Sequence, residues 1–250
     1  MQLSVLTWNI HKGFTSGNSA FVLPRMRELI RAAGVDVVLL QEVQGEHHGH
    51  AGRIGNWPEE SQFEFLADQV WPHYAYGKNA ILDQSHHGNA ILSKYPFTQW
   101  ENLNVALFRK ASRSLLHGTL QIPGTMKRVH VLCLHLGLLG FERRQQLRIL
   151  NTHLHQISAA HEAMIIGGDF NDWTGRQVKR YLDPALGLEE VFMQSGQRHA
   201  RTFPARWPFL CMDRIYFSGL NLQSCSLMDD KAWHELSDHV PMVARFELAD

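Results

Sequence analysis

The chain lacks an excess of charge of either sign. Its 250 residues contain 24 Lys and Arg against 24 Asp and Glu, with 16 His besides. A protein dedicated to binding nucleic acid usually carries a basic excess, so this balance argues against tight, non-specific binding to long polyanions. It does not exclude a nuclease, because a local basic patch could suffice.

Long apolar runs and cysteine pairs are missing as well. No stretch approaches the roughly 18 uninterrupted apolar residues that a transmembrane helix requires. The start of the chain, MQLSVLTWNI, has neither the basic flank nor the cleavage site of a secretory signal. The three cysteines form no C-x-x-C pair and cannot all be bridged among themselves. These absences predict a reduced, cytoplasmic protein without a transmembrane segment.

An alternation of strand and helix patterns runs along the whole chain. The segment LPRMRELIRAAG predicts a helix with an early proline that stops at Gly34, and residues 61–71 and 142–160 have the apolar spacing of two more helices. Residues 44–58 are rich in Gly and His without periodicity, which predicts a loop. Strands are predicted for QLSVLTWN, VDVVLLQEV, RVHVLCLHLG, AMIIGGDFN, MDRIYFS and VPMVARFEL, and antiparallel strands for GNAILSKYP and SRSLLHGTLQI. Because no repeat or linker interrupts this pattern, residues 1–250 predict a single α/β domain with a mixed sheet or a pair of sheets.

The segment IIGGDFND, residues 165–172, raises the main chemical question. An apolar strand runs into a glycine pair and then into Asp169, Asn171 and Asp172. Charge near a core is costly unless something compensates it, and the compensation could come from a helix cap, a turn or a cation. Asp172 is best explained as a helix-start or turn residue.

Polar residues mark the ends of the other predicted strands too. Taken singly, each has an ordinary explanation as a turn residue, a helix-start carboxylate or a hydrogen-bonded interior histidine. Their repetition at five or six strand ends favours a shared site, because strand ends are where α/β sheets build sites. The residues are Asn9, Glu42, His135, Asp169, Asn171, Asp213, Asp238 and His239.

The residue types indicate the chemistry. Asn, Asp and Glu offer oxygen ligands, which suit Mg²⁺ or Mn²⁺ better than zinc. Asp213 beside His239 would form an Asp–His pair that orients the ring and raises its basicity. Asp169, expected next to the metal and the attacking water, could position or deprotonate that water, while Asn171 and His135 could donate hydrogen bonds to a phosphoryl oxygen. Together these features predict metal-assisted hydrolysis of a phosphate ester.

The order of the motifs resembles the endonuclease/exonuclease/phosphatase superfamily. TWNIH, LLQEV, GNAILSKYP, LHLG followed by RRQQL, GGDFND, MDRIYF and LSDHVPM occur in the order seen in that family, from Leu3 to Phe246. The resemblance implies a four-layer α/β sandwich of two packed mixed sheets, with the site at their shared edge. The family's acidic partner for its second histidine has no clear counterpart. Residue by residue, the resemblance implies metal binding by Asn9, Glu42 and Asp238, catalysis by Asp169, Asn171, Asp213, His239 and His135, and phosphate contacts from Arg113 and Asn171.

The substrate stays open at this level. A Mg²⁺- or Mn²⁺-dependent phosphoesterase acting on a small or lipid-derived ester is the first hypothesis, because the chain has no basic run. A nuclease or DNA-repair enzyme is the second, and a catalytically silent binding module on the same scaffold is the third. Weaker hypotheses place Arg143 or Arg144, His86 or His87, and the aromatic residues Trp57, Trp207 and Phe209 near the substrate. The His-rich segment GEHHGHAGRIG could bind zinc or nickel, although a loop at the rim of the site is the simpler interpretation.

Overall fold

The computed structural model describes residues 1–47, 57–82, 85–107, 113–125, 127–158 and 162–248. Its strands are β1 (Gln2–Asn9), β2 (Val37–His47), β3 (His73–Leu82), β4 (Ser85–Ser93), β5 (Phe97–Asn104), β6 (Ser114–Gln121), β7 (Arg128–His135), β8 (Ala163–Asp169), β9 (Glu189–Glu190), β10 (Asp213–Ser218), β11 (Leu220–Leu227) and β12 (Met242–Leu248). Its α-helices are α1 (Leu23–Ala33), α3 (Gln62–Ala67), α4 (Gly140–Ile157), α5 (Arg176–Tyr181), α6 (Val191–Gln194) and α7 (Lys231–His234).

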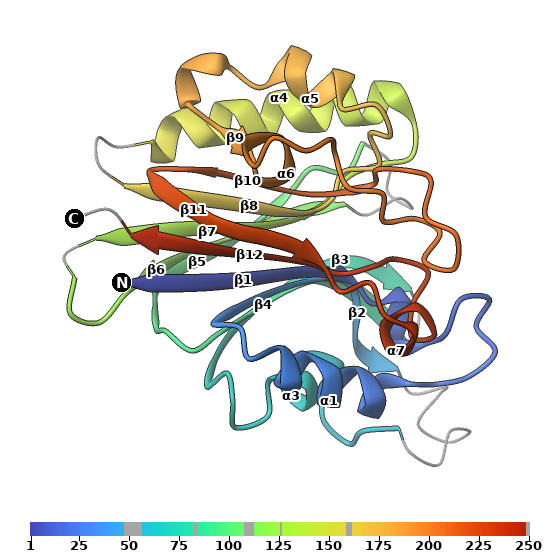
Figure 1. The fold of residues 1–250 in the computed structure, drawn as a ribbon. Coiled ribbons are helices and arrows are strands. Elements are labelled where there is room, and N and C mark those ends of the chain that lie inside the picture. Colours follow the sequence, from blue (N-terminus) through green and yellow to red (C-terminus); the bar gives the residue numbers. More distant parts are fainter. Residues whose placement is uncertain (48–56, 83–84, 108–112, 126, 159–161, 249–250) are drawn as a thin grey trace.

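Two six-stranded sheets pack face to face between helices (Figure 1). The first has the order β11-β12-β1-β2-β4-β3, and the second has the order β5-β6-β7-β8-β10-β9. Both sheets are mixed, because β1 is parallel to β2 and β7 is parallel to β8 while the other pairs are antiparallel. Helices α1 and α3 cover the outer face of the first sheet, and α4 and α5 cover that of the second. The predicted four-layer α/β sandwich is therefore confirmed.

Local sequence explains how the outer helices form. Helix α1 has Pro24 in its first turn, buries Leu23, Met26 and Ile30 on one stripe, and ends at Gly34, whose φ of 65° is left-handed. Helix α3 starts with a capping box between Ser61 and Glu64. Among the described residues, no helix combines the length and apolarity that crossing a membrane would require.

Several details differ from the sequence predictions. The helix predicted over 61–71 covers only Gln62–Ala67, because Asp68 leaves the helical conformation with a φ of 46°. Residues 44–47 are not a loop but continue β2 alongside β4, and residues 48–56 lie outside the described part of the chain. The segments GNAILSKYP and SRSLLHGTLQI are both antiparallel strands, yet they belong to different sheets, as β4 and β6.

The strand directions bring the polar strand ends to one edge. Asn9 is in register with Gln41 at the ends of the parallel pair β1–β2, and His135 is in register with Asp169 at the ends of β7–β8. Strand β10 runs antiparallel to β8, so its first residue, Asp213, lies opposite Asp169. The topology thus assembles residues that are more than 200 positions apart in the chain.

Candidate active site

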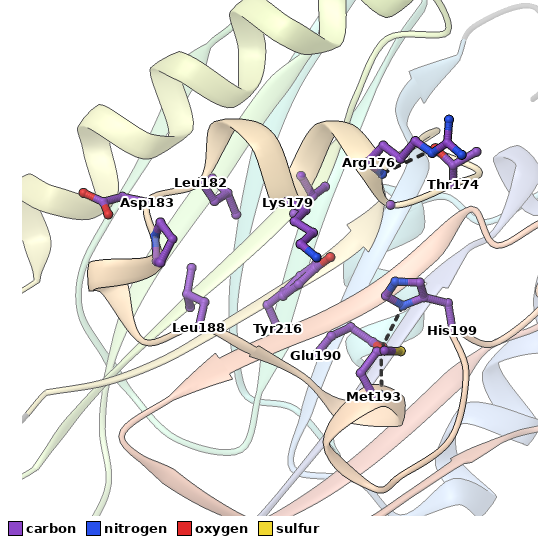
Figure 2. Close-up of a pocket in the computed structure, with 13 residues that line it drawn as sticks. Thr174, Arg176, Lys179, Leu182, Asp183, Leu188, Glu190, Met193, His199 and Tyr216 are labelled. Atoms are coloured by element: carbon purple, nitrogen blue, oxygen red, sulfur yellow. Dashed lines mark hydrogen bonds and ion pairs between the residues drawn. The ribbon is translucent and has the colours of Figure 1, made fainter.

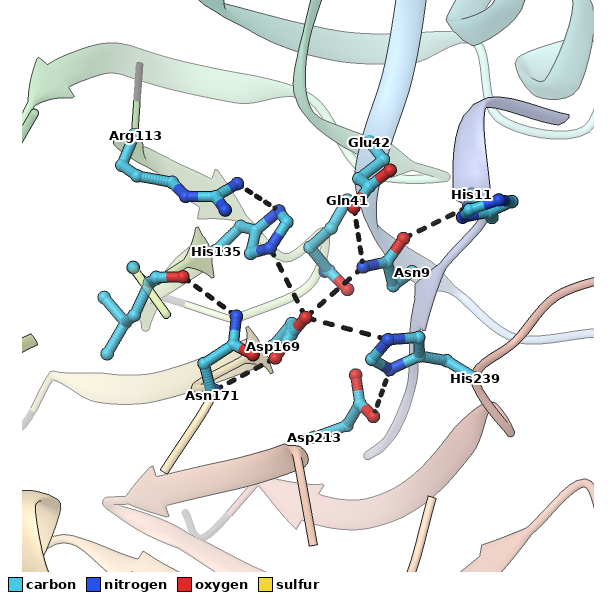
Figure 3. A network of polar contacts seen from close by, with 12 residues as sticks. Asn9, His11, Gln41, Glu42, Arg113, His135, Asp169, Asn171, Asp213 and His239 are labelled. Atoms are coloured by element: carbon cyan, nitrogen blue, oxygen red, sulfur yellow. Dashed lines mark hydrogen bonds and ion pairs between the residues drawn. The ribbon is translucent and has the colours of Figure 1, made fainter. Parts of the chain in front are cut away.

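A network of polar side chains lies where the two sheets meet at this edge (Figure 3). Buried polar contacts beneath it join the sheets. Asn89 on β4 donates hydrogen bonds to the carbonyls of Ser114 and Cys133 in the opposite sheet. Gln41 on β2 donates to Thr7 Oγ1 and lies 3.2 Å from Cys133 Sγ. These bonds fix the spacing of the sheets directly below the network.

Asp169 lies at the centre of the network and is 2% exposed. Its Oδ1 accepts a hydrogen bond of 3.0 Å from the backbone N–H of Asn171. Its Oδ2 lies 3.3 Å from Asn9 Nδ2, 3.4 Å from His135 Nε2 and 3.8 Å from His239 Nε2. Burial, opposed by the charge of His239, raises the pKa of Asp169 to about 7. A carboxyl group with a pKa near neutrality is suited to accept a proton from a reacting water.

Asp213 and His239 form a close pair on the other side of Asp169. His239 Nδ1 lies 2.8 Å from Asp213 Oδ2, and both side chains are buried. Burial alone would lower the pKa of His239, but the charge of Asp213 and the hydrogen bond to it prevail and raise this pKa to about 10. The ring is therefore protonated at neutral pH and directs its Nε2–H towards the centre of the site. Such a ring can donate a proton or stabilise negative charge.

His135 has a different environment. Arg113 donates from its guanidinium to His135 Nδ1 at 3.1 Å, so the ring carries its proton on Nε2 and presents it to Asp169. Burial, together with the charges of Arg113 and His239, holds the pKa of His135 well below its usual value. An arginine thus occupies the place where the sequence offered no acidic partner. His135 is built as a neutral hydrogen-bond donor, and Arg113 is brought into the site as predicted.

Asn9, Glu42 and Asp238 lie together on the first-sheet side of the site. Asn9 Nδ2 is 3.4 Å from Glu42 Oε1, and Ser237 Oγ donates to the Asn9 carbonyl while lying 3.4 Å from Asp238 Oδ1. The Glu42 and Asp238 side chains are 19% and 21% exposed, so their oxygens reach solvent. The two accessible carboxylates fit a hard dication that keeps several waters, which is the usual coordination of Mg²⁺. Asn9 Oδ1 accepts from the His11 N–H at 3.1 Å and keeps a second lone pair for such an ion.

Two strained backbone positions aim side chains at this site. Glu42 has a φ of 57° at an irregularity of β2, where the register with β4 shifts between Leu40 and Val43. Asn171 has a φ of 50° and donates from Nδ2 to the Leu136 carbonyl. Left-handed conformations in non-glycine residues cost energy and cluster at functional sites. Asn171 therefore holds Asp169 through its backbone and ties the β8 end to the loop after β7.

Asp172, in contrast, has a structural role. Its Oδ2 accepts hydrogen bonds from the backbone N–H groups of Gln177 and Val178 at the start of α5. The helix-start interpretation of this residue is confirmed. The compensation for the other carboxylate in GGDFND comes from imidazole, amide and backbone donors around Asp169.

Sequence reasoning missed two neighbours of the metal-type residues. Lys12 Nζ lies 3.9 Å from Glu42 Oε2, and His11 Nδ1 lies 3.5 Å from Asp238 Oδ2. Both follow the TWN segment after Ile10, and both adopt a positive φ. His11 ends the TWNIH motif and Lys12 follows it, which was the available signal, but no pattern in the sequence marks the sharp turn that brings them back to the site.

Some of the weaker predictions fall near the site. Burial is the main cause that lowers the pKa of His87, and the charges of Lys12, Glu42 and Arg113 also affect this pKa. Burial lowers the pKa of Arg143, and the charges of Asp172 and Asp169 oppose this effect. Its guanidinium donates to the carbonyls of Gly137 and Leu138. His86 instead contacts Tyr76, Trp57 stacks on Phe21, and Arg144 is exposed.

Exposed apolar side chains surround the same edge. They lie on the loop that follows β7 and the first turn of α4, on the loop that follows β8, and on the loop that precedes β10. The last of these loops contacts the site directly, because Phe203 packs on His239 and the N–H of Ala205 donates to the Asp238 carbonyl. This apolar rim consists of Leu138, Leu139, Phe141, Trp173, Trp207 and Phe209, with Trp207 77% exposed.

A hollow of about 450 Å³ between α5 and β10 is separate from this network (Figure 2). Its walls include Leu182, Leu188 and Tyr216, with a Glu190–His199 ion pair of 3.0 Å at one side. None of the residues in contact with Asp169 lines it. A larger hollow of about 610 Å³, lined by residues such as Thr15, Arg206 and Lys231, does not include Asp169 or its contacts either. The concentration of ionisable groups, not cavity size, therefore places the chemistry at the strand ends.

Comparisons with known proteins identify relatives of this chain and of its fold. The profile of the Endonuclease/Exonuclease/phosphatase family matches residues 6–239. The uncharacterized protein YbhP of Escherichia coli K12 is 41% identical over 244 residues, which are 98% of this chain and 96% of that protein. An endonuclease/exonuclease/phosphatase from Beutenbergia cavernae superposes with a TM-score of 0.81 at 23% identity, covering 99% of this chain and 72% of that one. D. rerio TDP2 complexed with single strand DNA product gives 0.72 at 20% identity, covering 98% and 99%.

Proposed function

Because this chain belongs to the endonuclease/exonuclease/phosphatase family, we propose that it is a divalent-metal-dependent phosphoesterase acting on a small or lipid-derived phosphate ester. The observation that carries the proposal is the contact of Asp169 with Asn9, Asn171, His135 and His239 at one sheet edge. Each group has a separate use in hydrolysis. A binding module would have no need for this unbroken set of contacts, which argues against a catalytically silent scaffold.

The residues divide the reaction between them. Asp169, whose pKa is raised, accepts the proton of the attacking water. Arg113 and Asn171 donate hydrogen bonds to the phosphoryl oxygens, where charge grows in the transition state, while the Nε2–H of His135 orients Asp169. His239, held as an imidazolium by Asp213, adds positive charge or a proton on the leaving-group side. When bound by Asn9, Glu42 and Asp238, Mg²⁺ or Mn²⁺ would supply Lewis-acid stabilisation of the phosphate.

Two features support a small or lipid-derived substrate. The balanced charge of the chain gives no general attraction for a polyanion. The apolar rim beside the site would contact the hydrocarbon part of an ester whose phosphate lies at Asp169.

The three free cysteines support a reduced, cytoplasmic location.

DNA is the second candidate substrate. The D. rerio neighbour was solved with a single-stranded DNA product, and exposed aromatic side chains such as Trp173 and Trp207 could stack on unpaired bases.

A substrate screen tests the proposal. The purified protein would be incubated with Mg²⁺ or Mn²⁺ and with a generic phosphodiester, phospholipids, or nicked and abasic DNA. We expect metal-dependent release of product from small or lipid esters, lost with EDTA and in Asp169→Asn, a variant that keeps the size of the side chain. Hydrolysis of DNA alone would favour the nuclease. Equal turnover by wild type and Asp169→Asn would contradict the assignment of the site.

A further inference from the structure

A second group of ionisable side chains lies on the other face of the second sheet. His117 on β6 and His130 on β7 point outwards under α4, because they share their strand faces with residues of the outer core. His153, from α4, meets them there and is buried like the other two. His135 is five residues after His130 on β7, so its side chain points to the opposite face of the sheet, towards the candidate active site. The two groups therefore do not share a residue.

Three ligand atoms converge in this group. His153 Nε2 lies 3.1 Å from His117 Nδ1, which lies 3.4 Å from Glu101 Oε1, and the third side of the triangle is 3.8 Å. A tetrahedral ion with bonds of about 2.0–2.1 Å needs neighbouring ligand atoms about 3.3–3.4 Å apart. The three separations bracket this value, so an ion could be accepted with shifts of a few tenths of an ångström.

The hydrogen bonds of His130 are compatible with a tautomer of His117 that can bind an ion. Glu162 can only accept at 2.5 Å, so His130 donates from Nε2, and its Nδ1 lies 2.9 Å from His117 Nε2 and 3.3 Å from Thr119 Oγ1. In the tautomer that carries its proton on Nε2, His117 donates to His130 Nδ1. Its own Nδ1 then holds a lone pair that points at His153 and Glu101.

In this tautomer a bound cation would remove an unfavourable contact. His153 Nε2–H can satisfy His117 Nδ1, but the Glu101 carboxylate then faces a second acceptor at 3.4 Å. A positive ion between them would take an electron pair from each of the three atoms. The chain of His117, His130 and Glu162 also reproduces the arrangement in which a carboxylate orients a metal-binding imidazole.

We propose that Glu101, His117 and His153 form a Zn²⁺ site that is independent of the phosphoesterase function. Two imidazoles and one carboxylate favour a zinc-type ion over Mg²⁺. The Glu101 side chain is 51% exposed, so the site opens to solvent on the side of the edge strand β5. The ion would join α4 to β5 and β6, and His153 lies 36 positions from His117 along the chain.

Metal titration of the full chain tests the site. Protein freed of metal by EDTA and returned to buffer with millimolar Mg²⁺ would be titrated with Zn²⁺ by calorimetry, and with Co²⁺ by absorption to report tetrahedral nitrogen ligation. We expect one tight Zn²⁺ equivalent that weakens at least tenfold in Glu101→Gln and in His153→Gln. His130→Gln should weaken it about 10–100-fold through the orientation of His117. At a free Zn²⁺ concentration 100 times the Kd, the Tm should rise by about 5–10 °C.

The controls separate this site from other zinc binding. His155→Gln changes a histidine on the same helix that pairs with Asp183 outside the triad, and it should bind Zn²⁺ like wild type. Zinc held by the His-rich segment 45–55 or by the Asp169 site would be equally strong in all variants. Glu101 is exposed, so Glu101→Gln should fold even if a buried histidine variant does not. An unchanged Zn²⁺ affinity and Co²⁺ spectrum in Glu101→Gln would overturn the proposal.

Discussion

Glu42 supplies one of the two carboxylates of the proposed Mg²⁺ site, and its contribution can be isolated by a single substitution. Glu42→Ala removes a charged ligand, so we expect turnover to fall roughly a hundred- to a thousand-fold and most of the divalent-ion dependence to disappear. Asn9→Ala removes a neutral amide and should cost less, about tenfold. Activity measured against Mg²⁺ concentration gives both values.

A matched variant distinguishes charge from shape at this position. Glu42→Gln keeps the side-chain length at the left-handed φ of residue 42, so it should lose activity nearly as far as Glu42→Ala if charge is what matters. Full activity and unchanged metal affinity in Glu42→Ala would show that the ion binds elsewhere.

Asp213 and His239 should act as a unit. Because the buried carboxylate holds the ring and its charge at 2.8 Å, His239→Ala and Asp213→Ala should each lower kcat by about 10²–10⁴-fold. The double variant should be little worse than either single variant. A complete double-mutant cycle of kcat measures this coupling, and strictly multiplicative losses would mean that the two residues work independently.

The contrast between Asp169 and Lys12 shows which residues of the site can be predicted. Asp169 ends a strand of apolar and glycine residues, so its unusual position is visible in the linear sequence. Lys12 reaches Glu42 only because the chain turns back through two positive φ angles after β1. A sequence states the residue type but not this turn, and no pattern of periodicity encodes it.

The strands likewise differ in whether the sequence alone predicts them. The central strand β8 is buried along its whole length and was predicted from its apolar run. The edge strand β5, FTQWENLN, is mostly exposed and has no apolar alternation. It exists because it pairs with β6, and β11 depends in the same way on β12. Pairing with a distant segment is a tertiary effect that local propensity does not report.

The glycine pair of β8 provides a test at this scale. Gly168 has a φ of 148°, and a Cβ there would lie 2.0 Å from the Leu134 carbonyl oxygen of β7. Gly168→Ala should therefore push β8 away from β7 and cost about 3 kcal/mol or more of unfolding free energy. Activity should fall with it, because His135 and Asp169 end these two strands.

Gly167→Ala is the matched control. Its Cβ would meet the movable end of Leu39 at 2.6 Å, without a strained φ, so we expect a smaller cost of about 1 kcal/mol. Denaturant unfolding of both variants gives the comparison. Equal stability losses would mean that close strand approach at Gly168 is not required.

At the scale of the whole molecule, balanced charge and a local cationic group have to be weighed against each other. The chain is neutral overall, yet Lys12, Arg113 and Arg143 all lie near the strand-end site. Three cations can hold one phosphate group, but a protein that tracks along duplex DNA needs contacts with many phosphates. The apolar rim adds a contact surface that does not depend on charge.

The salt dependence of DNA binding distinguishes a site for a single phosphate group from a groove that tracks duplex DNA. Each phosphate contact with duplex DNA contributes a slope of about −0.9 in log K against log salt, and proteins with 6–10 contacts lose affinity about 10³–10⁵-fold between 50 and 200 mM salt. We expect a slope no steeper than about −3, one unit for each of the three cations near the site. The measurement uses Asp169→Asn, which removes the proton acceptor and prevents cleavage during titration. Arg113→Gln in that background should reduce the slope by about one unit, whereas Arg144→Gln, at an exposed position of α4, should leave it unchanged. Tight binding with a slope near that of a duplex-tracking protein would contradict the small-substrate proposal and favour the nuclease.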